Sequence, residues 1–135
     1  MRVLVVTNLF PSKARPYGGV FVHEQVEALR QAGVDVDVLF IDGVATKLNY
    51  LRGILEFRRR IRAKRYDLVH AHYVYSGLIA RLQRRYPVVV TSHGSDTMGH
   101  EGWFLRRLAP RVDAVTITSR QNQERVGLLD SHLLP

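Results

Sequence analysis

Short apolar runs alternate along this chain with longer segments in which apolar residues recur every three or four positions. The short runs predict buried β-strands and the longer segments predict amphipathic helices. The expected strands are residues 3–7, 34–40, 67–72, 87–92 and 113–118. The expected helices are residues 20–32, 48–64, 73–85, 103–108 and 119–128, the last with Ser119 as its N-cap. Residues 128–135 fade without a clear sixth strand, although residues 132–135 look like the beginning of one.

The alternation of strand and helix, repeated five times, predicts one α/β fold class. Helical crossovers join parallel strands, so we expect a Rossmann-like, mostly parallel sheet with helices on both faces. The run at residues 87–92 is almost continuously apolar, which is typical of a central strand covered on both sides.

The spacing of apolar residues also predicts which side of each helix faces the core. The core-facing residues expected in the first helix are Phe21, Val22, Val26 and Leu29. Those expected in the second helix are Leu48, Leu51, Ile54, Leu55 and Ile61.

Length and composition narrow the class of protein. We expect the 135 residues to form a single domain. The absence of cysteine excludes disulfides, thiolate metal sites and cysteine nucleophiles. The apolar runs are too short to cross a bilayer, and the first of them is expected to be a strand rather than a leader. The sequence therefore favours a cytoplasmic protein.

A net charge of +8 indicates an anionic partner, and six cations gather within residues 58–65. One interpretation is a solvated helix end, where cations suit the helix dipole. The other is docking on an acidic membrane surface, which would place the protein at the inner membrane face. The candidate membrane-binding residues are Arg58, Arg59, Arg62, Lys64 and Arg65. Nucleic acid ranks last as a partner, because no aromatic residues interleave with these cations.

Gly18 and Gly19 lie between the first strand and the first helix. The start of a helix leaves backbone N–H groups unpaired, and glycines allow a ligand to approach closely. One interpretation is a flexible turn. The other, which we favour, is that both glycines donate backbone hydrogen bonds to a phosphate-like anion.

His93 ends the fourth expected strand, at the edge where ligands bind in open α/β sheets. Gly94 leaves space beside it, and Ser95 and Asp96 could orient hydroxyl groups of a ligand. The alternatives are a local hydrogen bond for His93 and a solvated turn for the other two.

The remaining histidines have simpler expected roles. His70 and His72 lie two apart on one strand and so face the same side. His72 is nearer the carboxyl end and is expected to line the cleft, whereas His70 is expected to pack in the core. A zinc site is disfavoured, because no cysteine or close carboxylate would complete it. We expect His23, one turn into the first helix, to face solvent.

Four patches of sequence together resemble the N-terminal domain of family 4 glycosyltransferases, the retaining enzymes of the GT-B fold. They are residues 17–22 (YGGVFV) with 29–33 (LRQAG), residues 66–72 (YDLVHAH), residues 87–96 (PVVVTSHGSD) and residues 113–119 (DAVTITS). Their order spans nearly the whole chain.

The resemblance implies that this domain binds the acceptor of a glycosyl transfer. A second domain, absent here, would bind the nucleotide sugar, which is a co-substrate, and no cofactor or metal is implied. His93 would contact the transferred sugar, while Tyr17, Gly18, Gly19, His72, Gly94, Ser95 and Asp96 would bind substrate. Many enzymes of this class use lipid-linked acceptors.

Two other functions stay open at the level of sequence. The chain could be a non-catalytic partner subunit of a split glycosyltransferase, or half of a sugar-nucleotide epimerase. As half of an enzyme it is expected to be inactive alone. Apolar surface meant for a second domain would then favour a homo-oligomer.

Overall fold

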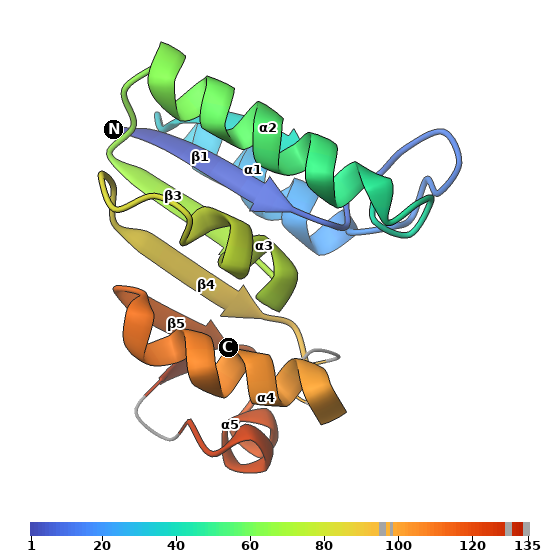
Figure 1. Ribbon diagram of the computed structural model, residues 1–135, viewed down its shortest axis with the longest axis vertical. Helices are drawn as coiled ribbons and strands as arrows, with labels where there is room; N and C mark the ends of the chain where they lie inside the picture. Colours follow the sequence, from blue (N-terminus) through green and yellow to red (C-terminus); the bar gives the residue numbers. More distant parts are fainter. Residues whose placement is uncertain (95–96, 98, 129–130, 134–135) are drawn as a thin grey trace.

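The computed structural model describes residues 1–94, 97, 99–128 and 131–133. Strands and helices alternate along it (Figure 1). The strands are β1 (Arg2–Thr7), β2 (Asp35–Phe40), β3 (Leu68–His72), β4 (Val88–Ser92), β5 (Ala114–Ile117) and β6 (His132–Leu133). The helices are α1 (Val20–Gln31), α2 (Leu48–Ala63), α3 (Val74–Ala80), α4 (Gly99–Leu108) and α5 (Arg120–Val126), with a 3-10 turn, η2, at Ala109–Arg111.

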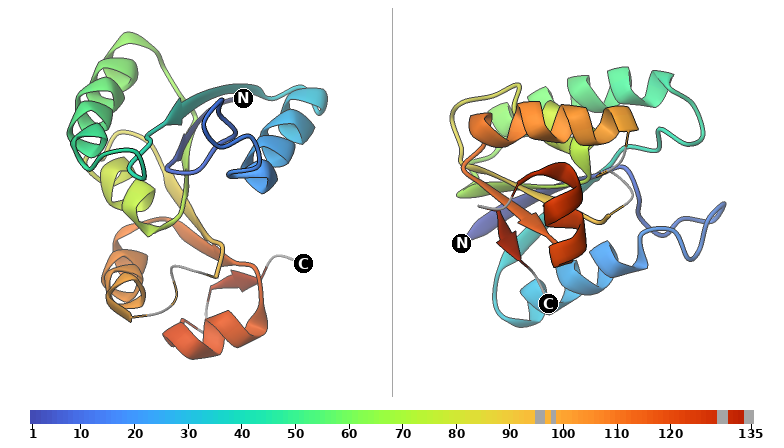
Figure 2. Two further views of the ribbon diagram at one scale, coloured as in Figure 1. Left: turned by 90° about the vertical axis from the view of Figure 1, so that its right-hand side faces the viewer. Right: turned by 90° about the horizontal axis from the view of Figure 1, so that it is seen from below.

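The strands form one sheet in the order β2-β1-β3-β4-β5-β6, and every pair is parallel. Helices cover both faces, with α2, α3 and α4 on one side and α1 and α5 on the other (Figure 2). The expected α/β fold class is therefore confirmed, and the continuously apolar strand β4 is central as predicted.

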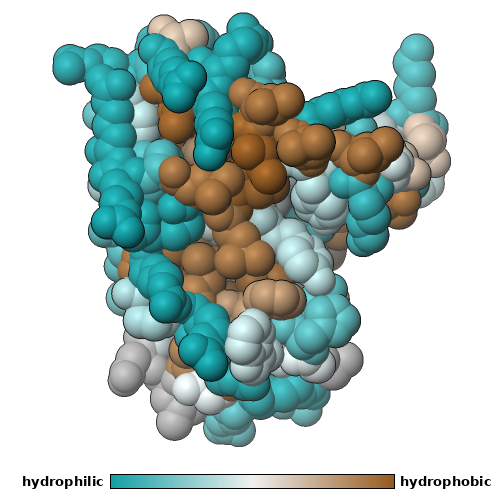
Figure 3. Space-filling model, viewed as in Figure 1, coloured by the Kyte–Doolittle hydropathy of each residue, from teal (hydrophilic) through white to brown (hydrophobic). Residues whose placement is uncertain are grey.

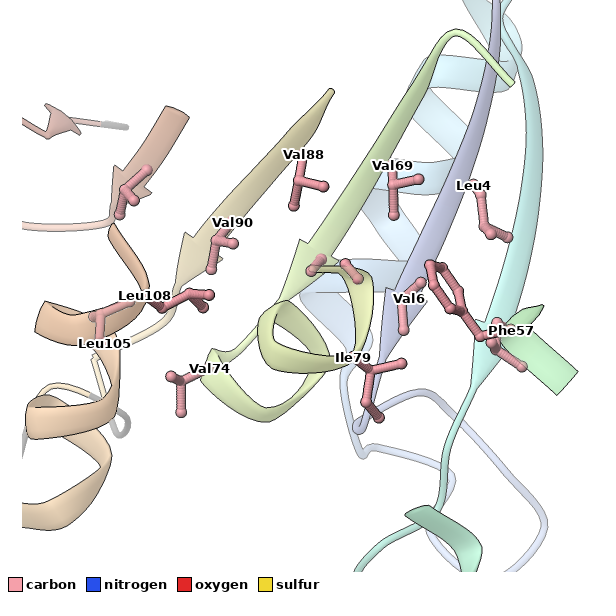
Figure 4. Close-up of a cluster of buried hydrophobic side chains, with 14 of the residues drawn as sticks. Leu4, Val6, Phe57, Val69, Val74, Ile79, Val88, Val90, Leu105 and Leu108 are labelled. Carbon is pink, nitrogen blue, oxygen red and sulfur yellow. The ribbon is translucent and has the colours of Figure 1, made fainter. Parts of the chain in front are cut away.

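The larger core lies between the sheet and the α2–α3–α4 layer. Phe57 of α2 is completely buried there against strand residues such as Leu4 and Val69 (Figure 4). A smaller core on the other face packs Val22 and Val26 of α1 against β1 and β2. Burying these side chains removes apolar surface from water on both sides of the sheet.

The largest differences from the predicted elements concern β6, α4, β5 and α3. The sheet gains β6 as a sixth strand. α4 begins at Gly99, earlier than expected, and β5 is shorter at both ends. α3 ends at Ala80 rather than at residue 85, because the Gln83 side chain bonds both backbone groups of Tyr86 and closes a turn. The predicted N-cap is confirmed, since the Ser119 hydroxyl accepts from the Asn122 amide.

The predicted inner faces of two helices need correction. Phe21 is exposed, because the side of α1 that packs on the sheet is formed by Val22 and Val26. Leu29 is partly buried beside them. On α2, Gly53 and Phe57 face the core, and Ile54 and Ile61 are partly buried. The other predicted core residues of α2 are exposed: Leu48, Leu51 and Leu55.

No helix in the part of the chain that the structure describes is both long and apolar enough to cross a membrane.

Candidate functional site

The carboxyl ends of the central strands lie level with one another. Thr7 of β1 pairs with His72 of β3, which pairs with Thr91 of β4, which in turn pairs with Thr116 of β5. In the order β2-β1-β3, the strand that follows β1 in the sequence lies on one side of β1, and the next strand, β3, lies on its other side. Such a switch point, outside the carboxyl ends of the strands, is where open α/β sheets bind ligands.

His93, the residue after β4, is joined to β3 at this edge. Its Nε2 lies 2.9 Å from Nδ1 of His72, and the two rings are stacked with centroids 5.2 Å apart. Of these two nitrogens, one must carry a proton and donate it while the other accepts, so the contact links the tautomers of the two rings. His72 therefore holds the orientation of the predicted site residue His93.

His72 is itself 1% exposed, so its ring supports His93 from within the sheet. The sequence placed His72 along the cleft; the structure places it at that edge but beneath the surface. Its Nε2 is buried without a hydrogen-bond partner among the described residues. An unpaired buried nitrogen is tolerable only if the ring is neutral and that atom carries no proton.

A chain of polar side chains continues from this pair across the sheet. The His70 ring stacks near His72 with centroids 4.3 Å apart, and its Nε2 lies 2.7 Å from the Thr91 hydroxyl. The Thr91 hydroxyl is in turn 2.6 Å from that of Thr116. His70 is thus hydrogen-bonded as well as packed, and neither threonine was predicted from the sequence as part of the site.

Burial keeps His70 and His72 uncharged. It lowers the pKa of His70 to about 4, with a smaller contribution from His93. Burial likewise lowers the pKa of His72 far below its usual value, and both neighbouring histidines add to the effect. Neutral imidazoles at this edge can donate or accept hydrogen bonds without bringing a positive charge.

Tyr73 stands next to the pair in a strained backbone conformation. It is the one non-glycine residue of the described chain with positive φ, at 73°. Its amide donates to the Thr91 carbonyl, and its ring lies 4.7 Å from that of His93. Such strain costs about 1–3 kcal/mol and persists where the surroundings enforce it, as they do at binding sites.

Gly19 forms the N-cap of α1 in the left-handed region, with φ 65°. A Cβ on it would lie 2.3 Å from the carbonyl oxygen of Leu9, so only glycine fits there. Gly18 does not meet its expected role, because its amide already donates to the Arg15 carbonyl. Tyr17, just before it, is exposed.

The two predicted halves of the site lie on the same edge of the sheet. Gly19 packs on Leu9, two residues beyond the end of β1. His93 is bonded to His72, whose strand neighbour is Thr7 of that same β1. The glycine bend and the histidine are therefore separated by the carboxyl ends of β1 and β3 rather than by the body of the molecule.

Further polar residues surround this edge. Gly94 has φ 96° and packs closely against the Asn122 side chain of α5. Ser76 of α3 reaches the Asn8 side chain, which follows β1, over 3.5 Å. Asn8, Ser76 and Asn122 were not predicted from the sequence, because a single polar residue outside a motif gives no indication of its role. The predicted Ser95 and Asp96 lie outside the described residues.

Other predicted residues lie elsewhere. His23 is exposed as expected, with its ring against Phe10. Within the described ranges, no three histidine or acidic side chains are grouped so as to hold a metal ion.

The cationic end of α2 is partly neutralised. Arg59 pairs with Glu56, and Lys64 pairs with Asp37. Across the described chain, the other three candidate membrane residues form no ion pair: Arg58, Arg62 and Arg65.

Comparison with known proteins adds to this geometry. The model of Glycosyltransferase Family 4 matches residues 18–128. A solved structure of sucrose-phosphate synthase from Thermosynechococcus elongatus is similar in fold, with a TM-score of 0.69 at 16% identity. The alignment covers 98% of this chain and 86% of that one. Among curated proteins, none matches this chain.

Proposed function

Because the chain belongs to glycosyltransferase family 4, we propose that it is the acceptor-binding half of a retaining enzyme that transfers a sugar from a nucleotide sugar. The match over residues 18–128 supports the family, and the His72–His93 pair at the carboxyl edge of the sheet supports the site. The donor-binding half would be a second domain or a partner chain.

In such a transfer the bond between the sugar C1 and the diphosphate breaks, and a bond to the acceptor oxygen forms on the same face of the sugar. The acceptor hydroxyl proton leaves with the departing phosphate. The imidazole of His93 would hydrogen-bond the transferred sugar. Since His72 engages its Nε2, the nitrogen facing a ligand would be Nδ1. His72 would serve as a positioning residue.

The start of α1 would receive the anionic group of a ligand. The Gly19 bend lies where α1 begins, and the helix dipole favours negative charge there. Because the amides of Gly18 and Val22 already donate to backbone carbonyls, the donors would be the amides of Gly19, Val20 and Phe21. Ser95 and Asp96, which follow Gly94 in the sequence, would orient the hydroxyl groups of the acceptor.

The acceptor would be a sugar or a lipid-linked molecule, and the protein would work at an acidic membrane surface. The chain's net charge of +8 supports an anionic surface as partner. Half of a transfer site cannot complete the reaction. Accordingly, the 135-residue chain alone is expected to transfer no sugar, and measurable turnover would contradict this proposal.

Binding tests the site directly. Saturation-transfer NMR with a panel of nucleotide sugars, at millimolar ligand, is expected to show contact with the wild-type chain. His93→Ala should weaken that signal severalfold, since it removes the ring at the edge. His132→Ala is the matched control, because His132 is exposed on β6, two strands away from β4. Equal signals from both variants would contradict the assignment of His93.

A further inference from the structure

Helix α2 presents leucines to solvent along its outer side. Leu48, Leu51 and Leu55 are 59–65% exposed, and their spacing places them on one stripe, opposite the buried Phe57. On the same layer, Leu82 after α3 and Trp103 of α4 are also about half exposed. Figure 3 shows an apolar patch running across this face of the molecule, bordered by hydrophilic side chains. We call these five residues the leucine band.

The charge of the chain is concentrated in the same segments. Residues 48–112 contain 13 basic and four acidic residues, so the excess positive charge of the whole chain lies here. One of the four acids, Glu56, accepts hydrogen bonds from Arg59 and Arg60, which lower its pKa to about 2. Glu56 therefore stays ionised, and its negative charge is paired with these two arginines. The α2–α3–α4 layer is therefore both apolar and cationic.

Cations stand next to the apolar positions on both outer helices. Arg58 and Arg62 continue the exposed stripe of α2 toward its C-terminus. On α4 the Arg107 guanidinium lies 4.9 Å from the centre of the Trp103 ring. Leucine and tryptophan beside arginine is the composition of helices that lie in a membrane interface, where apolar groups enter the acyl boundary and arginines meet phosphates.

The positive charge of this face favours an anionic bilayer over a second copy of the chain as the surface that covers it. A second copy would bring its own arginines against these, and like charges would repel. A bilayer with anionic headgroups complements the arginines and also accepts the leucines. We propose that the α2–α3–α4 face docks on an anionic lipid bilayer, with Leu48, Leu51 and Leu55 at the acyl boundary and Arg58 and Arg62 on lipid phosphates.

The docking face differs from the one expected from sequence. The run at residues 58–65 supplies only part of it, because Arg59 and Lys64 are engaged in ion pairs and Phe57 is in the core. The first two turns of α2 supply the apolar part. In this orientation the carboxyl edge of the sheet would face sideways, with the α2–α3–α4 layer between the sheet and the membrane. A lipid-linked acceptor could then reach it.

This inference deepens the membrane association proposed above but does not depend on sugar transfer. Its test is co-sedimentation of the chain with lipid vesicles in the absence of nucleotide sugar. The chain should bind vesicles of phosphatidylcholine with 30% phosphatidylglycerol and should bind pure phosphatidylcholine at least tenfold more weakly. Failure here leaves the sugar-binding result untouched, and the reverse also holds.

Matched variants locate the face. The double variant Leu51→Ser with Leu55→Ser should lose about tenfold or more in vesicle affinity, as should Arg58→Gln with Arg62→Gln. Phe21→Ser is the control, because Phe21 is at least as exposed as the leucines but lies on α1, on the other side of the sheet. Circular dichroism should show all variants folded, since the substituted positions are exposed.

Three outcomes would overturn the proposal. The first is that the wild-type chain binds no anionic vesicles. The second is that the leucine and arginine variants bind as tightly as the Phe21→Ser control. The third is a concentration-dependent dimer in sedimentation velocity that Leu51→Ser with Leu55→Ser abolishes while vesicle binding stays unchanged, which would make the band an interface between copies.

Discussion

At the scale of single residues, the start of α1 depends on one glycine. Gly19 has a left-handed backbone and lies against the Leu9 carbonyl, whereas Gly127, the C-cap of α5, is left-handed with open space around it. At both positions a residue other than glycine would be strained by the left-handed backbone, but only at Gly19 would its Cβ also collide with Leu9. Comparing substitutions at the two positions therefore separates the energy of backbone strain from the energy of the collision.

We expect Gly19→Ala to lower the free energy of unfolding by about 3 kcal/mol or more, through both strain and collision. Gly127→Ala should cost only about 1 kcal/mol, the price of the left-handed conformation. Urea denaturation of the two variants measures the difference. If both variants lost the same unfolding free energy, the Leu9 backbone would have moved to accommodate the new Cβ, and the contact would not require glycine.

The buried histidines make stability depend on pH. The pKa of His70 in the folded chain, about 4, lies below the value of about 6.5 in an unfolded chain. Below pH 6.5 the unfolded chain therefore binds more protons, and stability falls as the pH falls from 6.5 toward 4. At pH 5 the loss from His70 is about 2 kcal/mol, and His72 adds to it in the same direction.

Unfolding free energies measured at pH 7 and pH 5 test this sign. His70→Asn should reduce the dependence on pH, whereas the exposed His23→Asn should leave it unchanged. A wild-type chain equally stable at both values would contradict the neutral state of the cluster.

At the scale of elements, α2 shows where sequence reasoning succeeds and where it does not. The segment was predicted with its correct start and nearly its correct end, because apolar periodicity is strong over four turns. The predicted core-facing side was only partly right: Ile54 and Ile61 pack against the core, but the three leucines face solvent, since the helix has apolar residues on both sides. Periodicity cannot tell a core-facing stripe from an exposed stripe when both contain large apolar residues, here Phe57 on one and the leucines on the other.

Two substitutions in α2, one on each side of the helix, should have very different effects on the free energy of unfolding. Phe57→Ala empties a fully buried position and should cost about 3–5 kcal/mol. Leu51→Ala removes an exposed side chain and should change stability by less than about 0.5 kcal/mol. Thermal or chemical denaturation checks both. A large loss from Leu51→Ala would mean that this leucine belongs to the core after all.

At the scale of the whole molecule, the parallel sheet follows from the order of elements, which the sequence displays. The candidate site could be predicted only in part. His93 and Gly19 stand next to a strand end and a helix start, positions that topology brings to one edge. The bond from His93 to His72, the Thr91–Thr116 contact and the strain at Tyr73 depend on packing between distant segments, which no local pattern encodes.

The central claim is that the start of α1 and the end of β4 border one ligand site. An amide-resolved NMR titration of the isotopically labelled chain with a nucleotide sugar tests it most directly. The account predicts that the amides of Gly19 and Val20 shift together with those of His93 and Gly94, along one common binding curve. Shifts confined to one of these segments, or following two different curves, would contradict it.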